Sequence, residues 1–247
     1  MPGGSVWVVV VAGGEGRRFG GQKQFAQLGG RRVLDWALRA AEAVADGVVL
    51  VLPSSRAAVA PLGSSVGSGT SGRDAKRASC PVLVVGGGAT RSASVRSGLA
   101  AVPLEAEVVV VHDAARPLAS ASLFESVVAA VRAGADGAIC AIPVTDTVKR
   151  IGPQGSLITL ERSELLAVQT PQAFAAGVLR RAHDGEPEAT DDAALLEALG
   201  ARVVVVAGEA TNTKLTSPLD LVVLESVLER SATGADASGT APQEPCR

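Results

Sequence analysis

Short valine-rich runs recur along the chain and alternate with longer stretches of mixed apolar and polar residues. Apolar runs bounded by turn residues indicate strands that are buried on both faces of a parallel sheet. The mixed stretches between them indicate helices. We therefore predict strands at residues 6–11, 48–52, 82–85, 108–111, 137–142 and 202–206. We predict helices at residues 33–44, 91–101, 122–133, 173–183, 191–199 and 218–230.

Alternating strands and helices predict an α/β fold with a mostly parallel sheet and helices on both of its faces. Several helix ends carry their usual signals. Thr190 is the expected N-cap of the helix at 191–199, and Gly200 stands just past its end. Ser217 places a capping hydroxyl before a proline at the start of the last helix. The length of 247 residues suits one large domain or two small ones, and we assign residues 1–230 to a single domain.

Three segments interrupt this pattern. Residues 63–79 are rich in glycine, serine and basic residues, which predicts a mobile insertion between two strands. Residues 231–247 are polar and rich in alanine, glycine and proline, which predicts a disordered tail. Residues 145–169 contain two strand-like segments around a Gly-Pro-Gln-Gly turn, which indicates a hairpin. We expect this β-arm to project from the sheet and to serve as a dimer contact.

Composition narrows the class of protein. Aromatic residues make up only 2% of the chain and tyrosine is missing, so the core must consist of valine, leucine, alanine and isoleucine. The formal net charge of -2 argues against a general nucleic-acid binder. The three cysteines are far apart and form neither a metal-ligand spacing nor a disulfide framework. Because no apolar run is long enough to cross a bilayer, we expect a cytoplasmic protein without a membrane partner.

The first predicted strand runs directly into a glycine-rich turn that carries basic residues. The turn reads Ala12-Gly13-Gly14-Glu15-Gly16-Arg17-Arg18, and Lys23 follows five residues after Arg18. Glycines let backbone N–H groups approach an anion without a Cβ in the way. Arg18 and Lys23 add full positive charge, so the loop is suited to a polyphosphate. The simpler alternative is a cluster of turn glycines with basic residues on the surface.

Two common phosphate-binding motifs do not fit this loop. A P-loop requires a glycine before its lysine and a hydroxyl after it, whereas Lys23 lies between Gln22 and Gln24. A dinucleotide fingerprint would place its third glycine at position 19, but the glycine falls at Gly20. The acidic residue expected after the second strand is also missing, since that strand runs into Pro53-Ser54-Ser55.

Other strand ends carry polar groups that would share the same edge of the sheet, where α/β proteins bind ligands. Gly86-Gly87-Gly88 follows the third strand, and Ser94 lies in the first turn of the next helix. Asp113 and Arg116 follow the fourth strand, where they either contact a ligand or form a local ion pair that caps the turn. Lys214 follows the last strand, and by itself it would be read as a solvated surface charge.

Taken in order, these segments resemble the 2-C-methyl-D-erythritol 4-phosphate cytidylyltransferases over roughly residues 6–230. The matching segments are A-G-G-x-G-R-R-F, K-Q-F, G-G-A-T-R-x-x-S-V, H-D-A-A-R-P, D-T-V-K, T-P-Q, T-D-D and N-T-K-L-T. The resemblance implies a Rossmann-like nucleotidyltransferase fold and a homodimer joined through the β-arm. It also implies Mg²⁺-dependent transfer of a cytidylyl group from CTP to methylerythritol phosphate, giving 4-diphosphocytidyl-2-C-methyl-D-erythritol and pyrophosphate.

The resemblance assigns roles residue by residue. Catalytic roles fall to Arg18, Lys23, Arg162 and Lys214. Nucleotide-binding roles fall to Ala12, Gly13, Gly14, Gly88, Ala89, Ser94 and Asp113. Substrate-binding roles fall to Asp113, Arg116, Thr147, Arg162, Thr170 and Lys214. Thr147 and Arg162 lie on or beside the arm, so the resemblance implies that they act in the partner's site. The sequence departs from the family at Gln22, where many members have proline, and metal ligands are not assigned.

Three other functions remain to be weighed. A cytidylyltransferase for a pentitol phosphate such as ribitol 5-phosphate would share the nucleotide-binding half. A dinucleotide-binding oxidoreductase is disfavoured by the displaced glycine and the missing acidic residue. A non-catalytic nucleotide-binding regulator is disfavoured because the basic residues Arg18, Lys23, Arg162 and Lys214 are all present.

Overall fold

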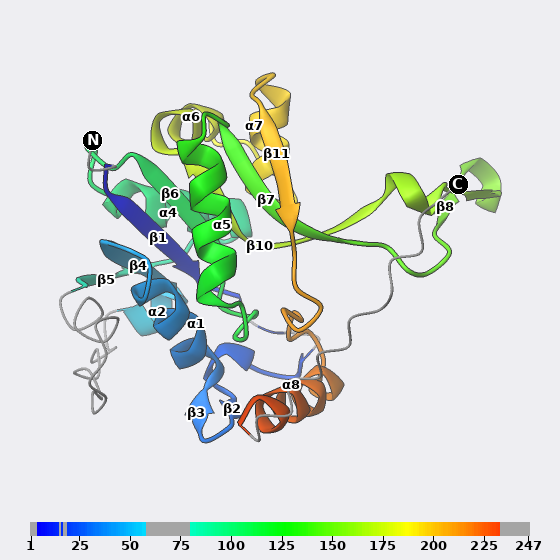
Figure 1. The fold of residues 1–247 in the computed structure, drawn as a ribbon, viewed down its shortest axis with the longest axis horizontal. Helices are drawn as coiled ribbons and strands as arrows, with labels where there is room; N and C mark the ends of the chain where they lie inside the picture. The colour runs from blue at the N-terminus through cyan, green and yellow to red at the C-terminus, as the bar shows by residue number, and fades with distance from the viewer. Residues whose placement is uncertain (1–3, 15, 17–18, 58–79, 233–247) are drawn as a thin grey trace.

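A computed structural model describes residues 4–14, 16, 19–57 and 80–232 of the chain. The predicted insertion at 63–79, nearly all of the predicted tail at 231–247, and Arg18 lie outside these described residues. The remaining residues form a large central sheet covered by helices, with a long arm that extends to one side (Figure 1).

The central sheet has seven strands in the order β11-β7-β10-β6-β1-β4-β5. Their bounds are β1 (Val6–Val11), β4 (Gly47–Leu52), β5 (Val82–Gly86), β6 (Val108–Asp113), β7 (Gly137–Pro143), β10 (Leu166–Ala175) and β11 (Val203–Ala207). All neighbouring pairs are parallel except those that β10 makes with β6 and β7. The predicted α/β fold with a mostly parallel sheet is therefore confirmed.

Helices cover both faces of this sheet because its strands are apolar on both sides. The helices are α1 (Val33–Glu42), α2 (Ser54–Ala57), α4 (Arg91–Ala101), α5 (Ala121–Arg132), α6 (Ala176–Ala182), α7 (Asp192–Ala198) and α8 (Pro218–Ala232). Along β1, Val8 and Val10 pack with α1 and α5 on one face. Val9 between them packs with α4, α6 and α7 on the other face. The period-two alternation of a strand thus produces two separate cores.

The last helix, α8, belongs to neither core. Leu224 of α8 packs with Leu28, Val33 and Leu215 in a third small cluster. Leu28 comes from a short ribbon formed by β2 (Gln27–Leu28) and β3 (Arg31–Arg32), which the sequence did not predict. This cluster holds the segment after β11 close to the segment after β1, and both segments carry a lysine that was predicted to be functional.

The predicted helix at 173–183 was wrong at its start. Residues 166–175 form β10, and helix α6 begins only at Ala176. Pro171 argues against a central strand, because proline lacks the N–H group that a ladder requires. The structure accommodates it where the register of β10 shifts between Gln169 and Gln172. Burial of Phe174 between the helices of one face then favours the strand over the local helical preference of its alanine neighbours.

Predicted helix caps were partly correct. Gly200 adopts φ +71° just past the C-cap of α7, as expected for a residue that ends a helix. The N-cap of α7 is Asp191 and not Thr190, because the Asp191 carboxylate accepts a hydrogen bond from the N–H of Ala194 at 3.0 Å. Ser217 does not cap α8 with its hydroxyl. Its hydroxyl and its N–H both donate to the carboxylate of Asp220.

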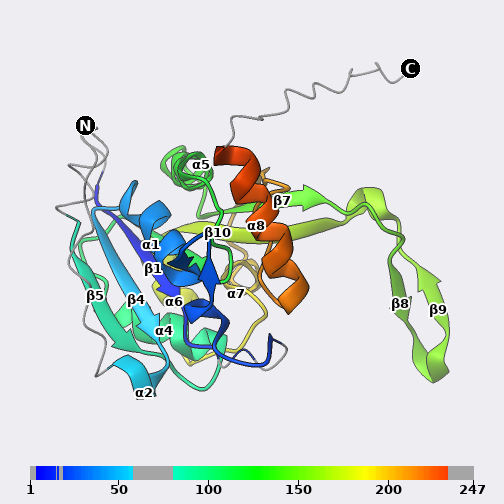
Figure 2. The same ribbon diagram turned by 90° about the horizontal axis from the view of Figure 1, so that it is seen from below.

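The predicted hairpin is confirmed and forms the tip of the arm. Beyond the sheet, the chain continues from β7 into β8 (Lys149–Ile151), the 3₁₀ turn η3 (Pro153–Gly155), β9 (Leu157–Thr159) and the turn η4 (Arg162–Glu164) before it returns as β10. Figure 2 shows this arm extending far from the body of the molecule. Ile151 and Leu157 on the hairpin are 76% and 67% exposed, so the arm carries apolar side chains into solvent.

Among the described residues, no helix combines the length and the apolar character that crossing a membrane requires.

Candidate active site

A cleft of about 800 Å³ opens at the carboxyl ends of β1, β4, β5 and β6. This is the edge at which α/β sheets bind ligands. Its walls come from segments that are far apart in sequence. The predicted residues that line it are Ala12, Gly13, Gly14, Lys23, Gly88, Ala89, Ser94, Asp113 and Lys214.

Hydrogen bonds from Gln24, in the 3₁₀ helix η2 (Lys23–Phe25), hold the first glycine-rich turn in place. The side-chain amide of Gln24 is buried and donates to the carbonyl oxygens of Ala12 at 2.8 Å and Gly14 at 3.2 Å. A Cβ on Gly14 would meet no atom within 4 Å, so this part of the turn faces open space. Sequence reasoning did not single out Gln24, although it stands beside Lys23 in the K-Q-F segment.

The second glycine-rich turn packs closely against the start of α4. A Cβ on Gly87 would lie 2.8 Å from Ser94 Oγ, and one on Gly88 would overlap Ala93. Close packing is therefore a structural reason for both glycines. Thr90 caps the helix by accepting from the N–H of Ala93 at 3.0 Å. Ser94 is buried and donates its hydroxyl proton to the carbonyl oxygen of Thr90 at 2.8 Å, which leaves its oxygen available as an acceptor.

Asp113 sits at the end of β6 between two basic side chains. Lys214 Nζ lies 2.6 Å from its Oδ2, and Arg91 Nε lies 3.2 Å from its Oδ1. Burial alone would raise the pKa of Asp113, but the charges of Arg91 and Lys214 outweigh burial and hold the pKa well below its usual range. Asp113 is thus ionised at neutral pH. Lys214 lines the cleft and is not a charge on the open surface. Its position after the last strand predicted this placement at the edge of the sheet.

The alternative ion pair between Asp113 and Arg116 does not form. Arg116 points to the other side of the turn, where it donates to the carbonyl oxygens of Asn212 at 2.7 Å and Val168 at 3.2 Å. Arg116 therefore ties the end of β6 to β10 and to the segment after β11, and it does not line the cleft.

Lys23 connects the first glycine-rich turn to the segment that follows β11. Its Nζ donates to the carbonyl oxygen of Leu215 at 2.6 Å, and Lys214 is the preceding residue. Backbone hydrogen bonds from Ser217 lower the pKa of Asp220, and the charge of Lys23 contributes a further lowering. Two lysines from segments 191 residues apart, 23 and 214, therefore reach the same cleft.

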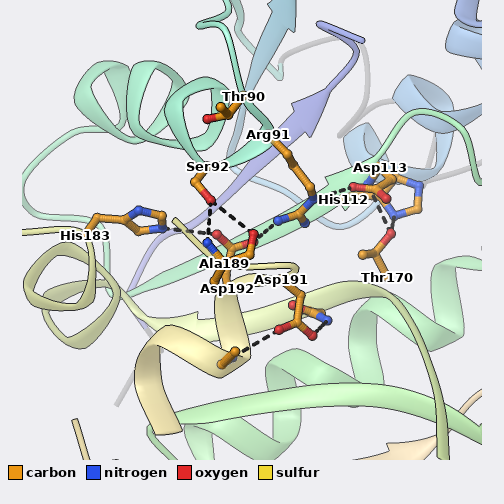
Figure 3. Close-up of polar contacts among 12 residues, drawn as sticks. Thr90, Arg91, Ser92, His112, Asp113, Thr170, His183, Ala189, Asp191 and Asp192 are labelled. Carbon is orange, nitrogen blue, oxygen red and sulfur yellow. Dashed lines mark hydrogen bonds and ion pairs between the residues drawn. The ribbon is translucent and has the colours of Figure 1, made fainter. Parts of the chain in front are cut away.

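Arg91 is a second residue of the cleft, after Gln24, that sequence reasoning missed. It lines the cleft and bridges two carboxylates, those of Asp113 and Asp192, with its Nη1 2.8 Å from Asp192 Oδ2 (Figure 3). Burial lowers the pKa of Arg91, but the two carboxylates outweigh this and raise it. The residue stands in the quoted G-G-A-T-R segment, yet nothing local indicates that Asp192, about a hundred residues later, would meet it.

A series of hydrogen bonds between buried polar groups holds the backbone of Asp113 in place. The hydroxyl oxygen of Thr170 accepts from the N–H of Asp113 at 3.0 Å and lies 3.2 Å from His112 Nδ1. His112 Nε2 lies 3.1 Å from the carbonyl oxygen of Arg116. Burial lowers the pKa of His112 to about 4, so the ring is neutral at pH 7. A carbonyl only accepts, so in the neutral ring Nε2 carries the proton and Nδ1 accepts from the Thr170 hydroxyl.

We expect the neutral state of His112 to make the protein less stable in mild acid. In the unfolded chain His112 takes up a proton near pH 6.5, whereas in the folded chain it resists protonation until about pH 4. The stabilisation is thus complete above pH 6.5 and is lost as the pH falls toward 4, by up to about 3 kcal/mol. Urea unfolding of wild type and His112→Gln across this range would measure it.

The His112→Gln variant keeps a donor and an acceptor but does not titrate, so its free energy of unfolding should fall less steeply as pH is lowered. The other titrating groups are common to both proteins and cancel in the comparison. Parallel pH profiles for the two proteins would contradict a neutral buried ring.

The remaining predicted residues lie away from the cleft of their own chain. Thr170 stands behind Asp113, as described above. Thr147 and Arg162 belong to the arm, where Arg162 is exposed and its Nη1 donates to the carbonyl oxygen of Thr145 at 2.9 Å. Neither arm residue lines the cleft. Arg18 falls outside the described residues, so its predicted role stays a prediction.

The described part of the chain contains no group of three or more histidine, cysteine, aspartate or glutamate side chains arranged to hold a metal ion. Among the described residues that line the cleft, Asp113 is the one carboxylate. A single carboxylate suits Mg²⁺ when phosphate oxygens supply further ligands, because Mg²⁺ in nucleotide sites is usually held in this way.

A mostly parallel α/β sheet with two glycine-rich turns and two lysines at one cleft is typical of nucleotide-binding enzymes. The sequence model of the family IspD, 2-C-methyl-D-erythritol 4-phosphate cytidylyltransferase, matches residues 6–230. The chain belongs to this family, and it is therefore a nucleotidyltransferase.

Individual relatives agree with the family. A 2-C-methyl-D-erythritol 4-phosphate cytidylyltransferase of Rhodococcus opacus is 43% identical over 235 residues, which cover 93% of this chain and 97% of the relative. A bifunctional enzyme IspD/IspF of Clavibacter michiganensis is 43% identical over 237 residues, but this chain spans only 56% of its length.

Solved structures show the same fold. The structure of 4-diphosphocytidyl-2C-methyl-D-erythritol synthase from Anaerococcus prevotii superposes with a TM-score of 0.75 at 27% identity, covering 92% of this chain and 99% of that one. The 2-C-methyl-D-erythritol 4-phosphate cytidylyltransferase of Thermus thermophilus gives a TM-score of 0.67 at 34% identity, covering 92% and 98%. The match to nearly complete chains confirms the Rossmann-like nucleotidyltransferase fold.

Proposed function

We propose that this chain transfers the cytidylyl group of CTP to 2-C-methyl-D-erythritol 4-phosphate in the cleft beside β1, giving 4-diphosphocytidyl-2-C-methyl-D-erythritol and pyrophosphate. The observation that carries the proposal is the meeting of Lys23, Lys214 and Asp113 beside the glycine-rich turn that follows β1. Membership of the family supplies the identity of the two substrates.

The reaction asks the protein mainly for positioning and for charge neutralisation. An oxygen of the acceptor phosphate forms a bond to the α-phosphorus of CTP. The bond from that phosphorus to the oxygen bridging the α- and β-phosphates breaks, and its electron pair leaves with pyrophosphate. The attacking phosphate is already ionised, so no strong general base is required. Cationic side chains act by stabilising the negative charge that gathers around the phosphorus.

Lys23 and Lys214 are suited to this task for different reasons. Lys23 stands beside the glycine-rich turn, where the triphosphate would lie, and offsets charge on CTP and the departing pyrophosphate. Lys214 stands next to Asp113 and is 41% exposed toward the cleft, so it can exchange its carboxylate partner for the acceptor phosphate. The resemblance to the family gives Arg18 the same task.

The second glycine-rich turn would receive the base. Gly88, Ala89 and Ser94 line the cleft there, and the close packing of Gly87 and Gly88 on α4 fixes the turn against the helix. The Ser94 oxygen can accept a hydrogen bond from the amino group of cytosine, because its proton is directed to Thr90. This arrangement supports selection of a small base with an exposed amino group.

Asp113 would bind the ribose hydroxyls or a Mg²⁺ ion that arrives with CTP. When bound, that ion would neutralise charge on the phosphates. The chain's own contribution is a carboxylate that remains ionised because Arg91 and Lys214 lower its pKa.

We further propose that the active form is a homodimer in which the arm of one subunit completes the cleft of the other. Two observations support this. Thr147 and Arg162 lie outside the cleft of their own chain. The hairpin exposes Ile151 and Leu157, which contact with a second copy would cover. In that dimer Arg162 would hold the acceptor phosphate together with Lys214 of the partner subunit.

The test is pyrophosphate release measured with CTP, UTP, ATP and GTP, each paired with methylerythritol phosphate and with ribitol 5-phosphate. We expect release with CTP and methylerythritol phosphate and much less with every other pair. Faster release with ribitol 5-phosphate would replace the acceptor proposed here. No release with any pair would favour a nucleotide-binding regulator.

A further inference from the structure

The T-D-D segment contributes no residue that lines the cleft. Its last residue, Asp192, is only 1% exposed at the start of α7. Its Oδ2 accepts from Arg91 Nη1 at 2.8 Å, and its Oδ1 lies 3.1 Å from Nε2 of the buried His183 (Figure 3). A buried carboxylate is costly unless it is paired and hydrogen-bonded, and here both oxygens have partners.

Arg91 connects this buried carboxylate to the cleft. Its Nη1 contacts Asp192 and its Nε contacts Asp113, so both ends of the guanidinium are held by carboxylates. Figure 3 shows the side chains of His183, Asp192, Arg91 and Asp113 in one continuous row. Arg91 and Asp113 line the cleft that would receive the nucleotide, whereas Asp192 and His183 do not.

The row divides the two oxygens of Asp113 between two cations. Arg91 contacts Oδ1 and Lys214 contacts Oδ2. If Lys214 moves to an anionic substrate, Asp113 keeps its partner Arg91 and remains ionised and in place. If Asp192 did not fix Arg91, Lys214 would be the only firmly placed cation on Asp113. Asp113 would then compete with the substrate for that lysine.

We propose that Asp192, supported by His183, is a positioning residue that fixes Arg91 so that Asp113 keeps its orientation while Lys214 engages the substrate. The inference rests on the proposed function for the identity of the ligand, and it adds a residue that touches neither substrate. Asp192 acts only through Arg91.

The surrounding contacts make a clean substitution possible. The loop before α7 is tied to α4 by other hydrogen bonds, from Thr90 to Glu188 at 2.9 Å and from Arg96 to the carbonyl oxygen of Pro187 at 2.9 Å. Asp192→Asn removes the charge and keeps the shape, so these contacts should keep the loop in place. Asp191→Asn is the matched control, because it removes a neighbouring charge that caps α7 without contacting Arg91, and asparagine caps helices equally well.

The experiment measures the dissociation constant of CTP by calorimetry for wild type, Asp192→Asn, Arg91→Met and the double variant. We expect Asp192→Asn to weaken CTP binding by roughly 10-fold, by analogy with the loss of groups that orient a ligand-binding residue. Asp191→Asn should stay within about 3-fold of wild type, because Asp191 neither lines the cleft nor contacts Arg91. In the Arg91→Met background, adding Asp192→Asn should change the affinity little further.

Fold changes that simply multiply in the double variant would overturn the inference, as would an equal loss in Asp191→Asn. If Asp192→Asn fails to fold, His183→Gln is the second variant, because His183 contacts Asp192. It should also weaken CTP binding in the wild-type background and have little effect in the Arg91→Met background. Pyrophosphate release by the wild type is measured separately. A wild type that binds CTP without releasing pyrophosphate would contradict the proposed function and leave the binding comparison decisive for Asp192.

Discussion

Replacing Lys23 with alanine should slow turnover of CTP and methylerythritol phosphate by roughly 10²- to 10³-fold, the loss typical of removing one group that stabilises transition-state charge. Such a loss corresponds to about 3–4 kcal/mol. The physical reason is that Lys23 stands beside the turn that would hold the triphosphate, and its ammonium group reaches the cleft next to Lys214. Steady-state kinetics of pyrophosphate release would measure the change.

A matched control separates this effect from a general loss of positive charge. Arg39 lies exposed on α1 and does not line the cleft, so Arg39→Ala lowers the net charge equally and should leave turnover unchanged. Lys23 also donates to the carbonyl oxygen of Leu215, so thermal unfolding of Lys23→Ala should be recorded beside the kinetics. Near-normal turnover with unchanged CTP affinity would remove Lys23 from the mechanism.

Mixed dimers should recover activity from two inactive variants if the arm of one subunit completes the site of the other. Lys23→Ala damages the cleft and Arg162→Ala damages the arm, and the two residues lie on separate parts of the chain. In a heterodimer, one site combines an intact cleft with an intact arm. Random mixing in equal amounts should therefore restore roughly a quarter of the wild-type sites in a symmetric dimer. Pyrophosphate release after refolding the mixture would measure it.

The control for the mixing experiment uses two variants of the same cleft. Lys23 and Lys214 both line it, so a heterodimer of Lys23→Ala and Lys214→Ala has one damaged residue in each site and should stay inactive. Recovery in this control would mean that the two lysines do not serve one site. Verified heterodimers of Lys23→Ala and Arg162→Ala that remain inactive would contradict a site shared between subunits.

The family and the fold were predictable because their signals are local. Each parallel strand appears as a short apolar run, and β1 with its glycine-rich turn is legible within about a dozen residues. The hairpin of the arm was predictable for the same reason, since its strands flank an obvious turn. Strand β10 was missed because Pro171 and its alanine neighbours give local signals that the sheet overrides.

The sequence by itself determined the class of the protein, the parallel sheet and the identity of the basic residues after its strands. Only the tertiary structure decided how those residues are connected. In the folded chain Lys214, and not Arg116, pairs with Asp113. Thr170 bonds to the N–H of Asp113 and does not line the cleft. Arg91 links Asp192 to the cleft. The physical reason is that the periodicity of apolar residues indicates only which face of its own helix or strand each residue occupies. Pairing between charges about a hundred residues apart depends on the strand order that brings their loops to one edge.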